Sequence, residues 1–150
     1  MSKIVLLDAG PLGMISNPNA RGLNRECYEW MEALVVGGLD VRVPEIADYE
    51  VRRELLPAKK DEGIARLDLL KNTIGYLPLT TPVMLRAAEL WTHARQSGMP
   101  TADPKAFDCD VILAAQAIEV AGIVATDNIG HLSRFVIAKR WRDIKDTDLI

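Results

Sequence analysis

The chain begins with a short apolar run that ends in an acid, and this segment constrains the fold more than any other. Residues 4–7 are Ile-Val-Leu-Leu, a continuous apolar stretch typical of a strand that is buried on both faces. Gly10 and Pro11 end this strand, so Asp8 lies where it stops. A carboxylate there is costly unless something compensates it. Two interpretations stand at this point: Asp8 binds a cation, or it accepts a hydrogen bond from a backbone N–H in the following turn.

Further along, short apolar runs alternate with longer segments whose apolar residues have helical spacing. We predict further strands over residues 41–43, 76–79 and 123–126, and a last strand between residues 135 and 144. We predict helices over residues 23–36, 45–56, 59–73, 81–97 and 104–121. Pro78 confines its strand to an edge of the sheet. The segment from residue 10 to residue 22 is expected to be a polar loop, because it contains Pro11, Asn17 and Pro18.

Strands that alternate with helices indicate an α/β fold. We therefore expect one domain over residues 1–150, with a three-layer α/β/α arrangement around a mainly parallel sheet of about five strands. With 49% hydrophobic residues, the chain is long enough to bury a substantial core.

Composition excludes several classes of function. The formal net charge of −3 shows no global polycationic signature, so a nucleic-acid partner must be met by a local basic rim. Cys27 and Cys109 lack the spacing of a thiolate zinc site, and His93 and His131 lie far apart, which argues against histidine-rich metal chemistry. Neither Gly-rich nucleotide-binding loop is present. The N-terminus resembles neither a signal peptide nor a membrane span, so we expect a cytoplasmic protein with no membrane contact.

Four acids are expected at one edge of the predicted sheet. The carboxyl ends of parallel strands and the amino ends of the helices share one edge, where ligands bind. Asp8 and Asp127 follow predicted strands, and Glu50 and Asp110 lie in the first two turns of predicted helices. Crowded carboxylates repel one another, so such a cluster is favourable when a divalent cation lies among them. Oxygen ligands without His or Cys indicate Mg²⁺ or Mn²⁺, and such a site suits metal-assisted phosphodiester hydrolysis.

The helical acids also have ordinary structural interpretations. Glu50 has the alternative of a solvated pair with Arg53. Glu45 and Glu54 compete with it for the site, although an acid in a first turn, such as Glu45, most simply complements the helix dipole. The same predicted helix, over residues 45–56, contains Asp48, which is predicted to pair with Arg52 on the outside of the helix.

The remaining acids carry similar alternatives. Asp108 and Asp110 are two residues apart on a helix, so at most one of them points into the site. Asp127 has the alternative of setting a turn together with Asn128.

The ordered set of these motifs resembles the PIN-domain family, and in particular the VapC-type toxins. The first match is the strand that ends in Asp8, and the second is the segment 44–53, in which the family's second acid corresponds to Glu50. The third is the run 110–115, which resembles D-x-x-I-A-A and selects Asp110 over Asp108. The last is the strand followed by residues 126–128, similar to the family's T-x-N or T-x-D. Matches extend over nearly the whole chain.

This resemblance implies a five-stranded parallel sheet, Mg²⁺ or Mn²⁺, and endoribonuclease activity. Members are often the toxin of a toxin–antitoxin pair and often dimeric, which implies RNA, an antitoxin protein and a second copy as partners. Asp8, Glu50 and Asp110 correspond to the metal ligands, and Thr126 belongs to the last motif. Many members carry a fourth acid where this chain has Asn128, so that position falls either to Asn128 or to Asp127 beside it.

Basic residues near the expected rim are candidates for holding the RNA backbone, and ordinary surface charge is the alternative for each. They are Arg52, Arg53, Lys139, Arg140 and Arg142. A PIN-type module that binds RNA or protein without cleavage is the rival from another class. A haloacid-dehalogenase-like phosphatase also begins with a strand and an Asp, but it needs a second Asp where this chain has Gly10.

Overall fold

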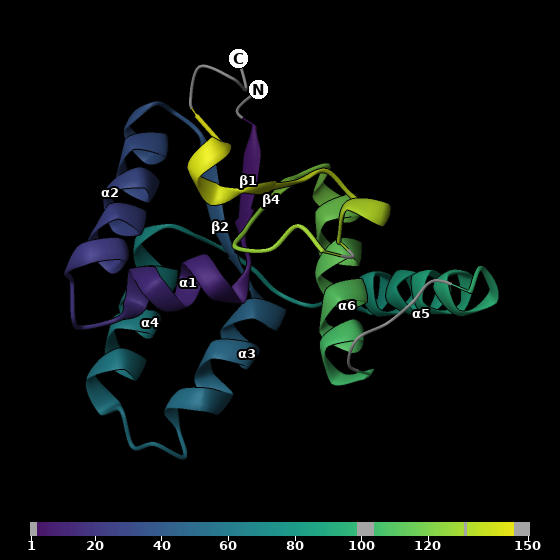
Figure 1. Ribbon diagram of the computed structural model, residues 1–150, viewed down its shortest axis with the longest axis horizontal. Coiled ribbons are helices and arrows are strands. Elements are labelled where there is room, and N and C mark those ends of the chain that lie inside the picture. The colour runs from purple at the N-terminus through teal and green to yellow at the C-terminus, as the bar shows by residue number, and fades with distance from the viewer. Residues whose placement is uncertain (1–2, 99–103, 131, 146–150) are drawn as a thin grey trace.

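A five-stranded parallel sheet forms the centre of the molecule. The computed structural model describes residues 3–98, 104–130 and 132–145. The strand order is β3-β2-β1-β4-β5, and every neighbouring pair is parallel (Figure 1). The strands are β1 (Ile4–Leu7), β2 (Asp40–Pro44), β3 (Gly75–Leu77), β4 (Ile123–Thr126) and β5 (Ala138–Arg140). Each predicted strand is confirmed within a few residues, and β3, which ends just before Pro78, lies at an edge as expected.

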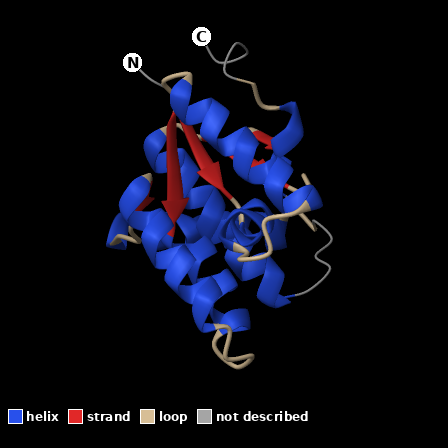
Figure 2. Cartoon of the chain, turned by 90° about the vertical axis from the view of Figure 1, so that its left-hand side faces the viewer, coloured by secondary structure: helices blue, strands red, loops and turns tan. Residues whose placement is uncertain are grey.

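Helices cover both faces of this sheet, as the view in Figure 2 shows. They are α1 (Ala9–Ser16), α2 (Gly22–Val36), α3 (Glu45–Leu55), α4 (Asp61–Thr73), α5 (Thr81–Gln96) and α6 (Pro104–Val120), with short 3₁₀ turns at Leu132–Arg134 and Trp141–Asp143. Buried side chains of α1, α2 and α4 pack with one face of the sheet, and those of α6 pack with the other. Helix α5 packs against α6 rather than on the strands. The expected α/β fold is therefore confirmed.

Side-chain alternation along the strands explains why both faces are covered. Val5 and Leu7 belong to one apolar cluster, whereas Leu6 between them belongs to the other. All three are fully buried. A strand that is apolar at every position can be buried in this way only between two layers of helices.

The segment after the first strand is a helix, so the predicted polar loop from residue 10 is wrong there. Helix α1 begins directly after Asp8, and Pro11 is its third residue. The first N–H groups of a helix have no intrahelical acceptor, so a proline in the first turn loses no hydrogen bond. Leu12 and Ile15, three positions apart, are buried on its inner face. Gly10 and Pro11 end the strand as predicted, but they do not prevent a helix.

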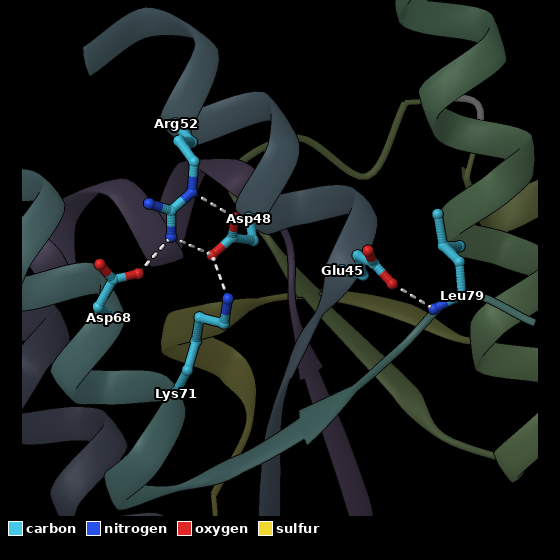
Figure 3. A network of polar contacts seen from close by, with 6 residues as sticks. All are labelled: Glu45, Asp48, Arg52, Asp68, Lys71 and Leu79. Carbon is cyan, nitrogen blue, oxygen red and sulfur yellow. Dashed lines mark hydrogen bonds and ion pairs between the residues drawn. The ribbon is translucent and has the colours of Figure 1, made fainter. Parts of the chain in front are cut away.

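A network of charged side chains joins α3 to α4 (Figure 3). Arg52 lies 2.9 Å from Asp48 through Nε and 2.6 Å from Asp68 through Nη2, and Lys71 Nζ lies 3.4 Å from Asp48. The predicted pair between Asp48 and Arg52 is present, but its position on the outside of the helix is wrong, because Asp48 is only 6% exposed. Burial opposes ionisation of Asp48, yet Arg52 and Lys71 together hold its pKa below the ordinary value.

Two further polar contacts fix the start of α3, the helix that carries Glu50. Glu45 accepts a hydrogen bond of 2.7 Å from the backbone N–H of Leu79, just beyond β3 (Figure 3). Gln116 of α6 is fully buried; its Nε2 donates to Leu77 O, and its Oε1 accepts from the N–H of Ile46. Helix α3 is therefore anchored to both the β3 edge and α6.

Among the described residues, no helix is both long enough and apolar enough to cross a membrane. His131 lies outside the described residues.

Candidate functional site

The parallel sheet brings the predicted acids to one edge of the molecule. Strands β1 and β4 are hydrogen-bonded neighbours with Leu7 opposite Ala125, so Asp8 and Asp127 follow adjacent strand ends. Glu50 lies in the second turn of α3 and Asp110 in the second turn of α6. Four different elements thus contribute one carboxylate each, as the sequence predicted.

Asp8 is held by two hydrogen bonds. Its Oδ1 accepts from the N–H of Ala9 at 2.7 Å and caps α1, while its Oδ2 accepts from Oγ1 of Thr126 at 2.8 Å. The turn-capping alternative is therefore present in the structure. This cap leaves the Asp8 carboxylate able to bind a cation, since each of its oxygens can accept a second interaction. Thr126 is only 2% exposed, so this contact orients Asp8 from inside the protein.

Burial and mutual repulsion make ionisation of three acids unfavourable. Loss of hydration raises the pKa of Asp8, and the charge of Asp127 raises it further, while the two hydrogen bonds act in the opposite direction. Burial and then the charges of Asp8 and Asp110 raise the pKa of Glu50 to about 7, although Arg53 opposes this. Burial and the charge of Asp8 raise the pKa of Asp110 to about 6. The three carboxylates therefore lie close enough to feel one another's charge.

Asp127 lies against the first turn of α1 and is held by an aromatic side chain. Its Oδ1 accepts a 3.1 Å hydrogen bond from Nε1 of Trp141. A Cβ added to Gly10 would come within 2.2 Å of Asp127 Oδ2, so the absence of a side chain at Gly10 makes room for this carboxylate. Asn128 uses its backbone N–H to donate to Oγ1 of Thr126, and its side chain is exposed. Asp127 thus lies beside the first turn of α1, which Asp8 caps, whereas the backbone of Asn128 forms part of the turn after β4.

The donor set fits a hard divalent cation. Burial raises the pKa of the neighbouring Cys109 thiol to about 11, so without a metal it stays protonated at neutral pH. His93 is exposed on α5. Carboxylate oxygens alone suit Mg²⁺ or Mn²⁺, and a cation would offset the repulsion that raises the pKa values. As the side chains stand, the described part of the chain contains no group of three or more His, Cys, Asp or Glu placed to hold one ion. A cation would therefore have to draw the acids inward.

The competing acids are not among the charges that raise the pKa values of Asp8, Glu50 and Asp110. Glu45 is engaged with the backbone of Leu79, and Glu54 is exposed near the C-terminal end of α3. Asp108 is exposed and lines a separate hollow with Tyr49, whereas the charge of Asp8 raises the pKa of Asp110. Helical geometry separates Asp108 from Asp110 as predicted.

Two of the basic rim candidates have partners on the surface. The Arg53 guanidinium lies over the ring of Tyr49, 5.2 Å from its centroid. Arg142 forms an ion pair of 3.1 Å with Glu26 and also lies over the ring of Trp141. Arg53 lies near the cluster, since its charge acts on Glu50.

The other basic candidates differ in their availability. Arg52 forms ion pairs with two carboxylates, those of Asp48 and Asp68, in the network between α3 and α4. Lys139 and Arg140 lie on β5, and Arg140 is opposite Thr126 in the strand register. Arg140 is therefore at the same edge of the sheet as the acids.

A groove that sequence reasoning did not predict extends away from Glu50. It has a volume of about 770 Å³ and lies between α1, α3 and the connection to α4. Its walls include Gly10 and Gly13 on one side and Lys59 and Lys60 at the far end. Its lining combines residues from separate elements, so no local sequence signal could have identified it.

Comparison with known proteins identifies the fold. No protein-family model matches the sequence, and no curated protein matches it. The solved structures that match over nearly the full length include the following three. A chain of VapBC2 from Rickettsia felis, solved with a DNA fragment from its promoter, has a TM-score of 0.72 and 20% identity, covering 92% of this chain and 98% of that one.

The other two are similarly complete. FitAcB from Neisseria gonorrhoeae gives a TM-score of 0.70 at 24% identity, with 93% of this chain and 99% of that chain covered. DNA-bound VapBC from Salmonella typhimurium gives 0.67 at 17% identity, with 94% and 99% covered. Likeness at this level of identity establishes the architecture, and the chain accordingly has the PIN fold of the VapC-type proteins.

Proposed function

We propose that the protein is a Mg²⁺- or Mn²⁺-dependent endoribonuclease. The observation that supports this most is the convergence of Asp8, Glu50, Asp110 and Asp127 from four elements at one sheet edge. Three of these carboxylates have raised pKa values, so their charges are unfavourable without a counter-ion. Perturbed acids clustered at the carboxyl ends of parallel strands are typical of a catalytic centre.

Asp8, Glu50 and Asp110 would hold the cation. A bound divalent cation lowers the pKa of a water molecule and offsets charge on a phosphate. Thr126 and the N–H of Ala9 orient Asp8, so its free lone pairs have a defined direction. Asp127, whose Oδ1 accepts a hydrogen bond from Trp141, would accept a proton or support a second ion, and Asn128 is the neutral alternative for this role.

Cation binding is expected to depend on pH. The pKa of Glu50 is about 7 and that of Asp110 about 6, so both carboxyls carry protons to a significant extent below neutral pH. A cation must displace those protons, and its apparent affinity therefore falls as the pH falls.

We further propose that the protein is the toxin of a type II toxin–antitoxin pair and forms a homodimer. The supporting likeness is to chains of the VapBC and FitAcB complexes, whose folds match this chain over nearly its whole length. Co-expression with the product of the adjacent reading frame tests the antitoxin. Co-purification together with inhibition of cleavage supports the pair, and a neighbour that neither binds nor inhibits contradicts it.

Cleavage of RNA by the purified protein tests the enzymatic proposal. We expect cleavage with Mn²⁺, none with EDTA, and loss of cleavage in Asp8→Asn with an unchanged fold, because asparagine is also a favourable N-cap. Glu119→Gln, which changes an exposed acid near the C-terminal end of α6, is the matched control and is expected to remain active. RNA binding without cleavage in the wild-type protein would instead identify a non-cleaving RNA-binding module, and full activity in Asp8→Asn would refute the site.

A further inference from the structure

A second hollow, which shares Glu54 with the groove, lies between α3 and α6. It has a volume of about 540 Å³ and is lined by Tyr49, Arg53 and Glu54 of α3 and by Asp108 and Cys109 of α6. Glu50 directly follows Tyr49, and Asp110 directly follows Cys109, so the two helices that form the hollow also carry two acids of the cluster. The charges of Glu50 and Asp110 both act on the Cys109 thiol, in keeping with these positions.

The lining is suited to a nucleobase rather than to a phosphate. Tyr49 remains 54% exposed even though the Arg53 guanidinium lies 5.2 Å from its ring centroid. An exposed aromatic side chain beside a cation is how proteins stack single-stranded bases. Glu54 and Asp108 are acids on opposite helices, and they would repel a phosphate but accept hydrogen bonds from an amino group.

We propose that this hollow is a base-binding subsite for single-stranded RNA, in which a base stacks on Tyr49 and directs its amino-bearing edge toward Glu54 and Asp108. This inference rests on the proposed nuclease function, because it places the base next to the acids that would act on the backbone. It names a substrate preference for that site: unpaired nucleotides whose bases carry an exocyclic amino group, which uracil lacks. Arg53 is a positioning residue that holds the ring of Tyr49 and adds positive charge beside it.

Binding of fluorescent single-stranded hexanucleotides in EDTA, which prevents metal-dependent hydrolysis, tests the subsite. Loss of one stacked base corresponds to a weakening of roughly fivefold to a hundredfold. We expect Tyr49→Ala to lose affinity for oligo(A) and oligo(C) within this range, and Tyr49→Phe to retain it. Tyr28→Ala removes a partly exposed tyrosine from α2 and is the matched control, with no expected change.

The acidic side of the hollow is tested by the double variant Glu54→Gln and Asp108→Asn. We expect the wild-type protein to bind oligo(A) and oligo(C) more tightly than oligo(U), and the double variant to lose most of this preference. Equal affinities for all three oligomers in the wild-type protein would overturn the assignment of the amino edge.

The outcome for Tyr49→Ala separates this inference from the proposed function. If the wild-type protein cleaves RNA with Mn²⁺ and Tyr49→Ala has unchanged affinity and KM, the subsite is wrong and the nuclease proposal stands. If the wild-type protein neither cleaves nor binds RNA, both fail. Thermal denaturation of each variant excludes unfolding as the cause, since Tyr49, Glu54 and Asp108 are all exposed.

Discussion

Replacing Glu50 with glutamine is expected to stabilise the protein in the absence of divalent cations. The folded protein raises the pKa of Glu50 from 4.5 to about 7, mainly through burial and then through the charges of Asp8 and Asp110. A difference of this size corresponds to a cost of about 3 kcal/mol for holding the ionised group in the folded state at pH 8. Glutamine has nearly the same shape and carries no charge. Glu50→Gln should therefore recover about 2–3 kcal/mol, which for a chain of this size raises Tm by roughly 4–12 °C.

The sign of the pH dependence follows from the raised pKa. A carboxyl that binds its proton more tightly when folded destabilises the protein fully above the folded pKa, and it ceases to do so below the unfolded value. The wild-type protein should accordingly gain stability as the pH falls from 8 toward 5. Glu50→Gln should show less of this gain, and the two proteins should converge near pH 4. Thermal and urea denaturation in EDTA between pH 4 and pH 8 measure both effects.

Glu54→Gln is the matched control, since Glu54 is an exposed acid one turn further along α3. It should leave Tm and its pH dependence nearly unchanged. Saturating Mn²⁺ should reverse the order of the other two proteins, because it stabilises the wild-type protein more than Glu50→Gln. A Glu50→Gln variant that is less stable than the wild-type protein at pH 8 in EDTA would refute the electrostatic account of the cluster.

Three other predictions concern the site and its support. Millimolar Mn²⁺ should raise Tm by several degrees, because a hundredfold excess over Kd stabilises the folded protein by about 3 kcal/mol. EDTA should reverse this shift. An unchanged Tm would count against the metal site. Gly10→Ala should leave the free energy of unfolding within about 1 kcal/mol, because alanine favours a helix, but should weaken the Mn²⁺-induced Tm shift, because its Cβ displaces Asp127. Asp48→Ala should lower the free energy of unfolding by about 3 kcal/mol in urea denaturation at pH 7, because Arg52 and Lys71 lose a buried partner. That deficit should shrink as the pH falls through the lowered pKa of Asp48, and a deficit that is constant with pH would contradict this assignment.

Much of the architecture was predictable from local patterns. The run 4–7 and the run 123–126 are apolar and short, and both are central strands of the sheet. The rule that the carboxyl ends of parallel strands share one edge predicts that Asp8 and Asp127 lie together, and β1 and β4 are indeed neighbours. Helix α1 was missed because Pro11 and Gly10 ordinarily indicate a turn, and their compatibility with a first helical turn depends on Asp8 acting as the cap.

The finer features of the site could not be predicted from the sequence. The hydrogen bond from Thr126 to Asp8 joins residues 118 positions apart, and the one from Trp141 to Asp127 depends on β5 lying parallel to β4 at the sheet edge. The burial of Asp48 depends on α4 supplying Lys71, which helical spacing within α3 cannot reveal. The spacing of residues along the chain indicates which side chains reach the edge of the sheet. Their rotamers and the neighbouring elements determine what each side chain contacts there.

The junction between β1 and α1 has a mechanical consequence. Asp8 is the single residue between a strand at the centre of the sheet and a helix of eight residues, and its own backbone N–H donates to Ala125 O. Its backbone can move only with the strand or the helix, and its carboxylate can turn only by breaking its hydrogen bonds with the Ala9 N–H and Thr126. If a cation binds here, we expect the larger adjustment to come from Glu50 and Asp110, whose side chains would move toward the Asp8 carboxylate.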